Sequence, residues 1–138
     1  MIKMNKIYLA SSVEDKSIVK KIDEQIKEYN IEVIFKWWEF YPNSELDKEN
    51  HINHSIKAIK ECDLFVLYNS FNSKKTSGKY IELGIAIALN KPILCIGHIT
   101  SIFKYSILSS IGQFSKNIPE KIFTELKKCN KYKVIKNE

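Results

Sequence analysis

Glu82 is the residue of this chain whose type and setting best suit chemistry. It is the only charge between Tyr80 and Asn90, within the apolar stretch 78–89. Helical spacing places it on one face, expected to be buried, with Ile85, Ala86 and Leu89. A capping role is excluded because position 79 is Lys, whereas a capping box needs Ser or Thr there. A buried carboxylate is costly unless it is paired or has a task, so a carboxylate held in a cleft is favoured over an ordinary helix glutamate at the sheet edge.

The chemistry expected of Glu82 is nucleophilic. A carboxylate in the first turn of a helix should stay ionised, because the helix dipole and the free backbone N–H groups favour the charge. Such a group can attack or stabilise an anomeric carbon that passes through an oxocarbenium-like transition state. We expect Tyr8 to hydrogen-bond the carboxylate. Neutral donors around a sugar or phosphate are expected from Ser11, Ser12, Thr76, Ser77 and the backbone of Gly78.

The elements that would position these residues are strands alternating with helices. Strands are predicted at residues 6–11, 31–37, 64–68 and 93–97, with a short edge strand at 111–114. Helices are predicted at residues 13–29, 51–61, 78–89 and 119–128, with loops at 38–50 and 69–77. Alternation of this kind predicts a three-layer α/β domain of the flavodoxin or Rossmann type, with a mostly parallel five-stranded sheet.

The common strand order for such a sheet is 2-1-3-4-5, with a crevice between the first and third strands. This topology brings Tyr8, Ser11 and Ser12 to the same crevice as Glu82. No glycine-rich dinucleotide fingerprint and no phosphate-loop motif is present, which argues against a conventional Rossmann or P-loop enzyme. No cofactor and no metal is predicted. His51 and His54 have the spacing of two ligands on one helix face, but no third ligand follows at a recognisable spacing.

Length and composition indicate one soluble globular domain over residues 1–138. The chain is 44% hydrophobic and 28% charged, and its net charge is +6. All 22 basic residues are Lys, and the absence of Arg argues against nucleic-acid binding. The three widely spaced cysteines favour a reducing cytoplasm over a disulfide framework. The sequence has no signal-peptide pattern and no apolar run long enough for a bilayer.

The combination of Tyr8, the run 62–67 (CDLFVL) and the block 77–93 (SGKYIELGIAIALNKPI) resembles the nucleoside 2-deoxyribosyltransferase superfamily, which includes deoxynucleoside monophosphate N-glycosidases. The resemblance covers nearly the whole chain. It implies that Glu82 attacks C1′ of a nucleoside or nucleotide and that Tyr8 orients it. It also implies a homodimer or larger assembly.

Two positions depart from the pattern of that superfamily. Ser55 stands where an Asp is usual, and being shorter and neutral it is expected to leave room for a ribose 2′-OH or a phosphate. Thr76 stands where the transferases have Asp, and this favours the hydrolase branch, which often has Ser there. The phosphate-binding Arg of the hydrolases is also absent, and residues 13–15 occupy its region.

Other interpretations stay open at this point. The segment 10–16 (ASSVEDK) is similar to the opening of TIR domains, which can cleave the nicotinamide–ribose bond of NAD with a helix glutamate. A third possibility is a module with a decayed site that sequesters a nucleotide. Trp38 belongs to an aromatic cluster after the second strand, which serves either as a packing lid or as a wall on which a base stacks.

Overall fold

The structure is a computed structural model that describes residues 5–40, 45–71, 78–98, 109–112 and 115–137. For residues 45–46 and 131–137 it describes the backbone alone. All of the functional side chains predicted above lie within these ranges except Thr76 and Ser77.

The sheet has five strands in the order β2-β1-β3-β4-β5, and every neighbouring pair is parallel. The strands are β1 (Lys6–Ala10), β2 (Glu32–Val33), β3 (Leu64–Asn69), β4 (Ile93–Gly97) and β5 (Ser109–Ile111). The predicted fold class and strand order are therefore confirmed. The order reverses between β1 and β3, so the carboxyl ends of these two strands flank the crevice expected of such sheets.

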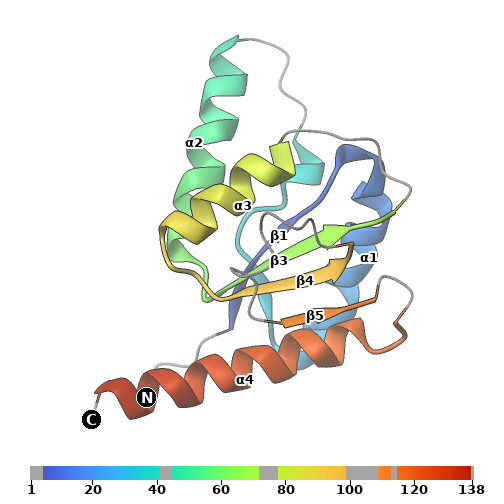
Figure 1. The fold of residues 1–138 in the computed structure, drawn as a ribbon. Coiled ribbons are helices and arrows are strands. Elements are labelled where there is room, and N and C mark those ends of the chain that lie inside the picture. The colour runs from blue at the N-terminus through green and yellow to red at the C-terminus, as the bar shows by residue number, and fades with distance from the viewer. Residues whose placement is uncertain (1–4, 41–44, 72–77, 99–108, 113–114, 138) are drawn as a thin grey trace.

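Helices cover both faces of the sheet. The α-helices of the described residues are α1 (Lys16–Ile26), α2 (Glu45–Glu61), α3 (Gly78–Ala88) and α4 (Ile118–Asn137). Short 3-10 turns stand at Val13–Asp15, Lys27–Tyr29 and Trp37–Glu39. Helices α2 and α3 lie together on one face, and α1 and α4 lie on the other (Figure 1). The right-handed crossovers of parallel strands place the helices in this way.

The core lies on the central strands. Every residue of β3 is buried, as its continuous apolar run predicts for a strand covered on both faces. On β1, Tyr8 lies opposite Phe65 of β3, and the two rings stack with centroids 5.6 Å apart and nearly parallel planes. Because side chains alternate along a strand, this pair faces one helical layer while Ile7 and Leu9 face the other.

Four predicted boundaries are wrong. The strand predicted at 31–37 contains only Glu32–Val33, because a 3-10 turn at Trp37–Glu39 carries the chain away from the sheet edge. Part of the loop predicted at 38–50 is helical, because α2 begins at Glu45. The sequence of its first turns is polar and lacks an apolar period, and these turns project beyond the sheet (Figure 1). The edge strand lies at Ser109–Ile111 rather than 111–114, and the last helix runs on to Asn137.

Two predicted helix faces also differ from the structure. The apolar spacing along residues 13–29 predicts a buried stripe that includes Val13 and Ile18, but these two residues are 63% and 38% exposed. Leu89 is exposed as well, because α3 ends at Ala88 before reaching it. Among the described residues, no helix is long and apolar enough to cross a membrane. Association into a dimer stays a prediction.

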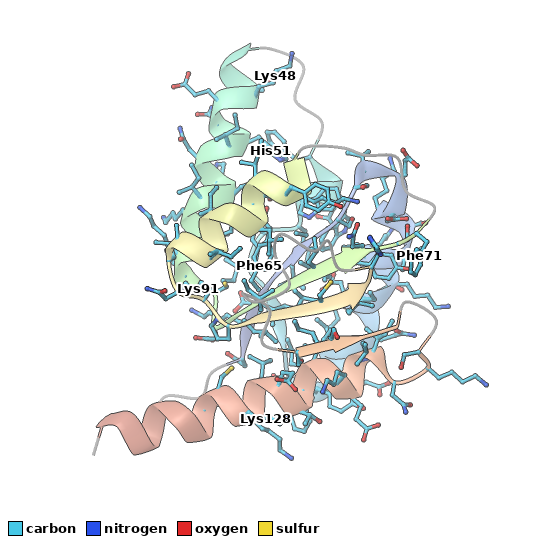
Figure 2. The ribbon with its side chains drawn as sticks, in the orientation of Figure 1. Lys48, His51, Phe65, Phe71, Lys91 and Lys128 are labelled. Atoms are coloured by element: carbon cyan, nitrogen blue, oxygen red, sulfur yellow. The ribbon has the colours of Figure 1, made fainter. Side chains whose placement is uncertain are left out.

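Lys91, which follows α3, bonds the end of α2. Its Nζ donates to the backbone oxygens of Lys60, at 2.6 Å, and Cys62, at 2.9 Å, where α2 ends (Figure 2). Carbonyls in the last turn of a helix lack partners within the helix, and a lysine there satisfies them and complements the helix dipole. The Lys-Pro pair that follows α3 therefore has a structural function as a cap of α2.

Replacing Lys91 with Met should weaken the fold. Lys91→Met removes both charge-assisted hydrogen bonds but keeps much of the apolar stem, so we expect a loss of about 1–2 kcal/mol in the free energy of unfolding. Urea denaturation measures this loss. Lys57→Met, which changes an exposed lysine of the same helix, is the matched control and should change stability by less than about 0.5 kcal/mol. Equal stability of the two variants would show that the cap is not important.

Candidate functional site

The centre of the candidate site is the contact between Tyr8 and Glu82. Tyr8 is fully buried on β1, and its hydroxyl donates a hydrogen bond to Oε2 of Glu82 on α3. Phe65, which supports the Tyr8 ring, lies at the centre of the sheet beneath α3 (Figure 2). The hydrogen bond from Tyr8 to Glu82 that the sequence predicted is therefore present in the structure.

The electrostatics of Glu82 differ from expectation. Glu82 is the fifth residue of α3, so it lies beyond the first turn, where the helix dipole acts most strongly. Burial raises the pKa of Glu82 from 4.5 to about 7, although the hydrogen bond from Tyr8 lowers it. The expectation of a fully ionised carboxylate is wrong, because loss of solvation outweighs the dipole. At neutral pH the group exchanges readily between its acid and its carboxylate.

Tyr8 is held in its neutral form. Burial raises the pKa of the Tyr8 phenol well above its ordinary range, and the charge of Glu82 and the hydrogen bond to it act in the same direction. A hydrogen bond between Ser55 and Tyr8 has the opposite effect on this pKa. A neutral phenol always carries its proton, so Tyr8 can act as a permanent donor to Glu82.

The other predicted site residues have mixed outcomes. Ser55, on α2, is buried, and its hydroxyl lowers the pKa of Tyr8 against the effect of burial. Ser11 and Ser12 follow β1 and are buried, and the Ser11 hydroxyl donates to the backbone oxygen of Ser12 at 2.8 Å. That bond uses the one proton of Ser11 in this structure, and donation to a ligand stays a prediction for both serines. Gly78 begins α3 and is exposed. Thr76 and Ser77 lie outside the described residues.

The aromatic residues that follow β2 have different surroundings. Trp37 is structural, because its Nε1 donates to the backbone oxygen of Leu9 at 2.7 Å. Trp38 is 6% exposed, and its buried Nε1 has no hydrogen-bond partner among the described residues. The ring of His51 lies 5.3 Å from that of Phe35 and 5.2 Å from that of Phe40. His51 and His54 therefore join an aromatic cluster, and both have ring contacts with Phe35.

Sequence reasoning missed a charged cluster at the carboxyl ends of β1 and β3. Lys79 is 2% exposed on the sheet-facing side of α3, where burial lowers its pKa and the charge of Asp15 opposes that effect. The hydroxyl of Ser70 lies 3.1 and 3.3 Å from the two carboxylate oxygens of Asp15. The helical spacing of Lys79, Leu83 and Ala86 puts all three on the buried face of α3. This pattern could have been recognised in the sequence.

The raised pKa of Glu82 leads to a prediction about stability. The native carboxyl binds its proton more tightly than the unfolded one, so the cost of burying it is absent below pH 4.5, grows as the pH rises, and is complete above pH 7. Glu82→Gln removes this cost. Relative to wild type, we expect it to gain roughly 2–3 kcal/mol more stability at pH 8 than at pH 5. Denaturant unfolding at the two pH values measures the difference.

Glu125→Gln is the matched control, with the opposite sign. Burial would raise the pKa of Glu125, but hydrogen bonds and charges from Lys121 and Lys128 outweigh it and lower the pKa. Their Nζ atoms lie 3.0 and 3.2 Å from Oε1 of Glu125. This pairing stabilises the fold above the unfolded pKa, so Glu125→Gln should be more destabilising at pH 8 than at low pH. A similar pH dependence for both variants would contradict the assignment to Glu82.

Comparisons with known proteins identify the family of the chain and agree with its fold. The family model for nucleoside 2-deoxyribosyltransferase matches residues 7–107. A solved CMP N-glycosidase, BcmB, from Clostridium botulinum is similar at 19% identity with a TM-score of 0.59, over 89% of this chain and 99% of that one. A 2-deoxyribosyltransferase from Bacillus psychrosaccharolyticus is similar at 18% identity with a TM-score of 0.59, over 77% and 85% of the two chains. None of the curated proteins matches the sequence closely. The chain belongs to the nucleoside 2-deoxyribosyltransferase family.

Proposed function

We propose that this protein breaks the N-glycosidic bond of a nucleoside or nucleotide, with Glu82 as the nucleophile. The observation that carries the proposal is the contact between Tyr8 and Glu82, in which a buried neutral phenol donates to a carboxyl group whose pKa is about 7. Membership in the family supports the reaction class. The names of the two similar structures include both a glycosidase and a transferase, so hydrolysis and transfer are both compatible with the fold.

The chemistry proceeds in two steps. A carboxylate oxygen of Glu82 attacks C1′, the C1′–N bond breaks, and its electron pair leaves with the base, whose nitrogen takes a proton from water or a nearby donor. Water or a second base then attacks C1′ and releases the Glu82 carboxylate. Both transition states resemble an oxocarbenium ion, which an adjacent negative charge stabilises.

The role of Tyr8 follows from its geometry. Its hydroxyl holds Oε2 of Glu82, which leaves the other carboxylate oxygen for the attack. A fixed rotamer reduces the entropy that must be lost before the reacting atoms meet. Donation by Tyr8 also favours the carboxylate over the acid, since it lowers the pKa of Glu82 against the effect of burial. Tyr8 therefore positions the nucleophile and increases its ionised fraction.

Base release should depend strongly on both residues. Glu82→Gln keeps the shape but removes the nucleophile and its charge, and we expect a loss of order 10²–10⁴ or more in kcat. Tyr8→Phe should cost less, about tenfold to a hundredfold, because it removes only the positioning hydrogen bond. The assay is release of free base from ribonucleosides, deoxyribonucleosides, their 5′-monophosphates and NAD.

The pH dependence of the same assay is a control on the identity of the nucleophile. For wild type, kcat/KM should fall about tenfold per pH unit below about pH 7, since only ionised Glu82 attacks. Release of nicotinamide from NAD alone would instead favour a TIR-like activity. Tight binding without release of any base would favour a sequestering module.

Trp38 is the residue that we assign to recognition of the base. Its ring is large enough to pack against a heterocycle, and its buried N–H has no partner among the described residues. A buried donor without a partner is costly, and an acceptor atom on a bound base would remove that cost. The carbonyl oxygen or ring nitrogen of a base is such an acceptor.

Trp38→Phe tests this assignment because it keeps an aromatic ring and removes the donor. We expect KM to rise roughly threefold to tenfold with little change in kcat, since one neutral hydrogen bond is lost. The control is Trp37→Phe, which loses the bond to the Leu9 oxygen and should lower stability while KM stays near the wild-type value. An unchanged KM in Trp38→Phe would remove Trp38 from the base site.

A further inference from the structure

Asn69 is a buried polar residue of this region that the proposed reaction does not use. It is the last residue of β3 and is 3% exposed. Its Nδ2 donates to the backbone oxygen of His98 at 2.6 Å and to the hydroxyl of Tyr80 at 3.4 Å. A carboxamide has two N–H donors, so these bonds use both, and the His98 oxygen can only accept, so the nitrogen must face it. Among the described residues, none donates a hydrogen bond to Asn69 Oδ1.

The two bonds of Nδ2 also set the direction of Oδ1. His98 follows β4 and Tyr80 lies on α3, so Nδ2 faces the β4 side of the strand end. The oxygen and nitrogen of a carboxamide lie on opposite sides of its carbon, which turns Oδ1 toward the β1 side. Strand β1 pairs with β3 only as far as Ala10, which lies opposite Leu67. Oδ1 is therefore directed to the crevice expected between the carboxyl ends of β1 and β3.

Asn69 lies on the same face of the sheet as the candidate nucleophile. Side chains alternate along a strand, so Asn69 shares its face with Phe65, which stacks on Tyr8. Its partner Tyr80 precedes Glu82 by two residues on α3. From the row of Tyr8 and Phe65, Asn69 lies ~13 Å further along β3, toward the carboxyl edge. A sugar whose C1′ contacts Glu82 can extend toward this edge, and its 5′ group reaches farthest from C1′.

The chemistry at this strand end favours a neutral donor over an anion. Oδ1 can only accept, and a hydroxyl carries a proton for it, whereas a phosphate dianion has only acceptors. The hydroxyl of Ser70, the next residue, lies 3.1 and 3.3 Å from the carboxylate oxygens of the buried Asp15. The charges of Asp15 and Glu14 both act on Lys79. Two carboxylates beside one ammonium leave a net negative charge among these residues, and this charge disfavours a phosphate.

We propose that Asn69 Oδ1 accepts a hydrogen bond from the 5′-hydroxyl of the substrate, so that the site takes nucleosides in preference to their 5′-monophosphates. The proposal rests on the proposed function and names its substrate class. A bound ligand covers Oδ1, and a ligand without the hydroxyl leaves a buried acceptor unsatisfied. A 5′-phosphate adds charge repulsion to that loss. Asn69 is thus a residue that determines specificity, and it takes no part in breaking the bond.

The experiment measures ligand binding to Glu82→Gln, in which the sugar stays intact, by isothermal titration calorimetry. The ligands are the common ribonucleosides and deoxyribonucleosides, their 5′-deoxy and 3′-deoxy analogues and their 5′-monophosphates. We expect a nucleoside to bind about threefold to tenfold more tightly than its 5′-deoxy analogue, the size of one neutral hydrogen bond. Its 5′-monophosphate should bind at least about tenfold more weakly than the nucleoside.

Substitution of Asn69 in the same background tests which residue discriminates. Asn69→Leu has a similar size without Oδ1, and it should bind a nucleoside and its 5′-deoxy analogue within about twofold of each other. The matched control is Tyr80→Phe, which removes one partner of Nδ2 but leaves Oδ1, and it should keep the full discrimination. If Asn69→Leu does not fold, Asn69→Asp decides, because its charged acceptor should increase the preference over the 5′-monophosphate. An unchanged preference in Asn69→Asp would overturn the proposal.

The outcomes separate this proposal from the proposed function. Tighter binding of 5′-monophosphates, no binding of any nucleoside, or a 5′-hydroxyl preference that persists in Asn69→Leu would each overturn the role of Asn69. A dependence on the 3′-hydroxyl alone would overturn the assignment to the 5′ position. If wild type releases no base from any substrate but Asn69→Leu abolishes the 5′-hydroxyl preference, the glycosidase proposal fails and the role of Asn69 stands. Base release by wild type with no effect of Asn69→Leu on discrimination would give the reverse result.

Discussion

Glu82 is half-buried next to a neutral, fully buried phenol, and most of the site follows from that arrangement. Burial alone would leave a carboxylic acid that is poorly nucleophilic at neutral pH. The hydrogen bond from Tyr8 lowers the pKa from that limit, to about 7. The carboxyl group is thus ionised to a useful extent while it remains weakly solvated, and weak solvation makes a carboxylate more reactive toward a cationic carbon. Such an arrangement reduces the stability of the fold, as expected for the catalytic role that we propose for Glu82.

The fold supplies the support that this contact requires. Tyr8 lies on the central strand β1 and stacks on Phe65 of the neighbouring strand, so the position of its hydroxyl is set by the most buried part of the sheet. The parallel order β2-β1-β3 brings α2 and α3 to the same face. Lys91, which follows α3, caps the end of α2 and joins the two helices that carry Ser55 and Glu82. The relative position of these side chains therefore depends on rigid elements rather than on loops.

Periodicity and strand order predicted the architecture, because a buried parallel sheet needs continuous apolar runs and crossover helices. They also predicted the meeting of Tyr8 and Glu82. Periodicity did not predict where β2 ends. The chain leaves the sheet edge at Trp37, whose hydrogen bond to the Leu9 oxygen cannot be recognised from the local sequence. Periodicity and strand order also missed the first turns of α2, because the sequence there is mostly polar and has no apolar period. The ionisation of Glu82 was misjudged because it depends on desolvation by residues distant in the sequence.

The central claim is that Glu82 forms a covalent bond to the sugar. A nucleoside fluorinated at C2′ tests it most directly, because fluorine destabilises the oxocarbenium-like transition states and slows release of the sugar from the enzyme. After incubation, intact-protein mass spectrometry should show the mass of one fluorinated sugar added to the chain. Peptide mapping should place it on Glu82, and Glu82→Gln should remain unmodified. A sugar attached to another residue, or base released by wild type at a normal rate with no adduct and with undiminished activity in Glu82→Gln, would contradict the account.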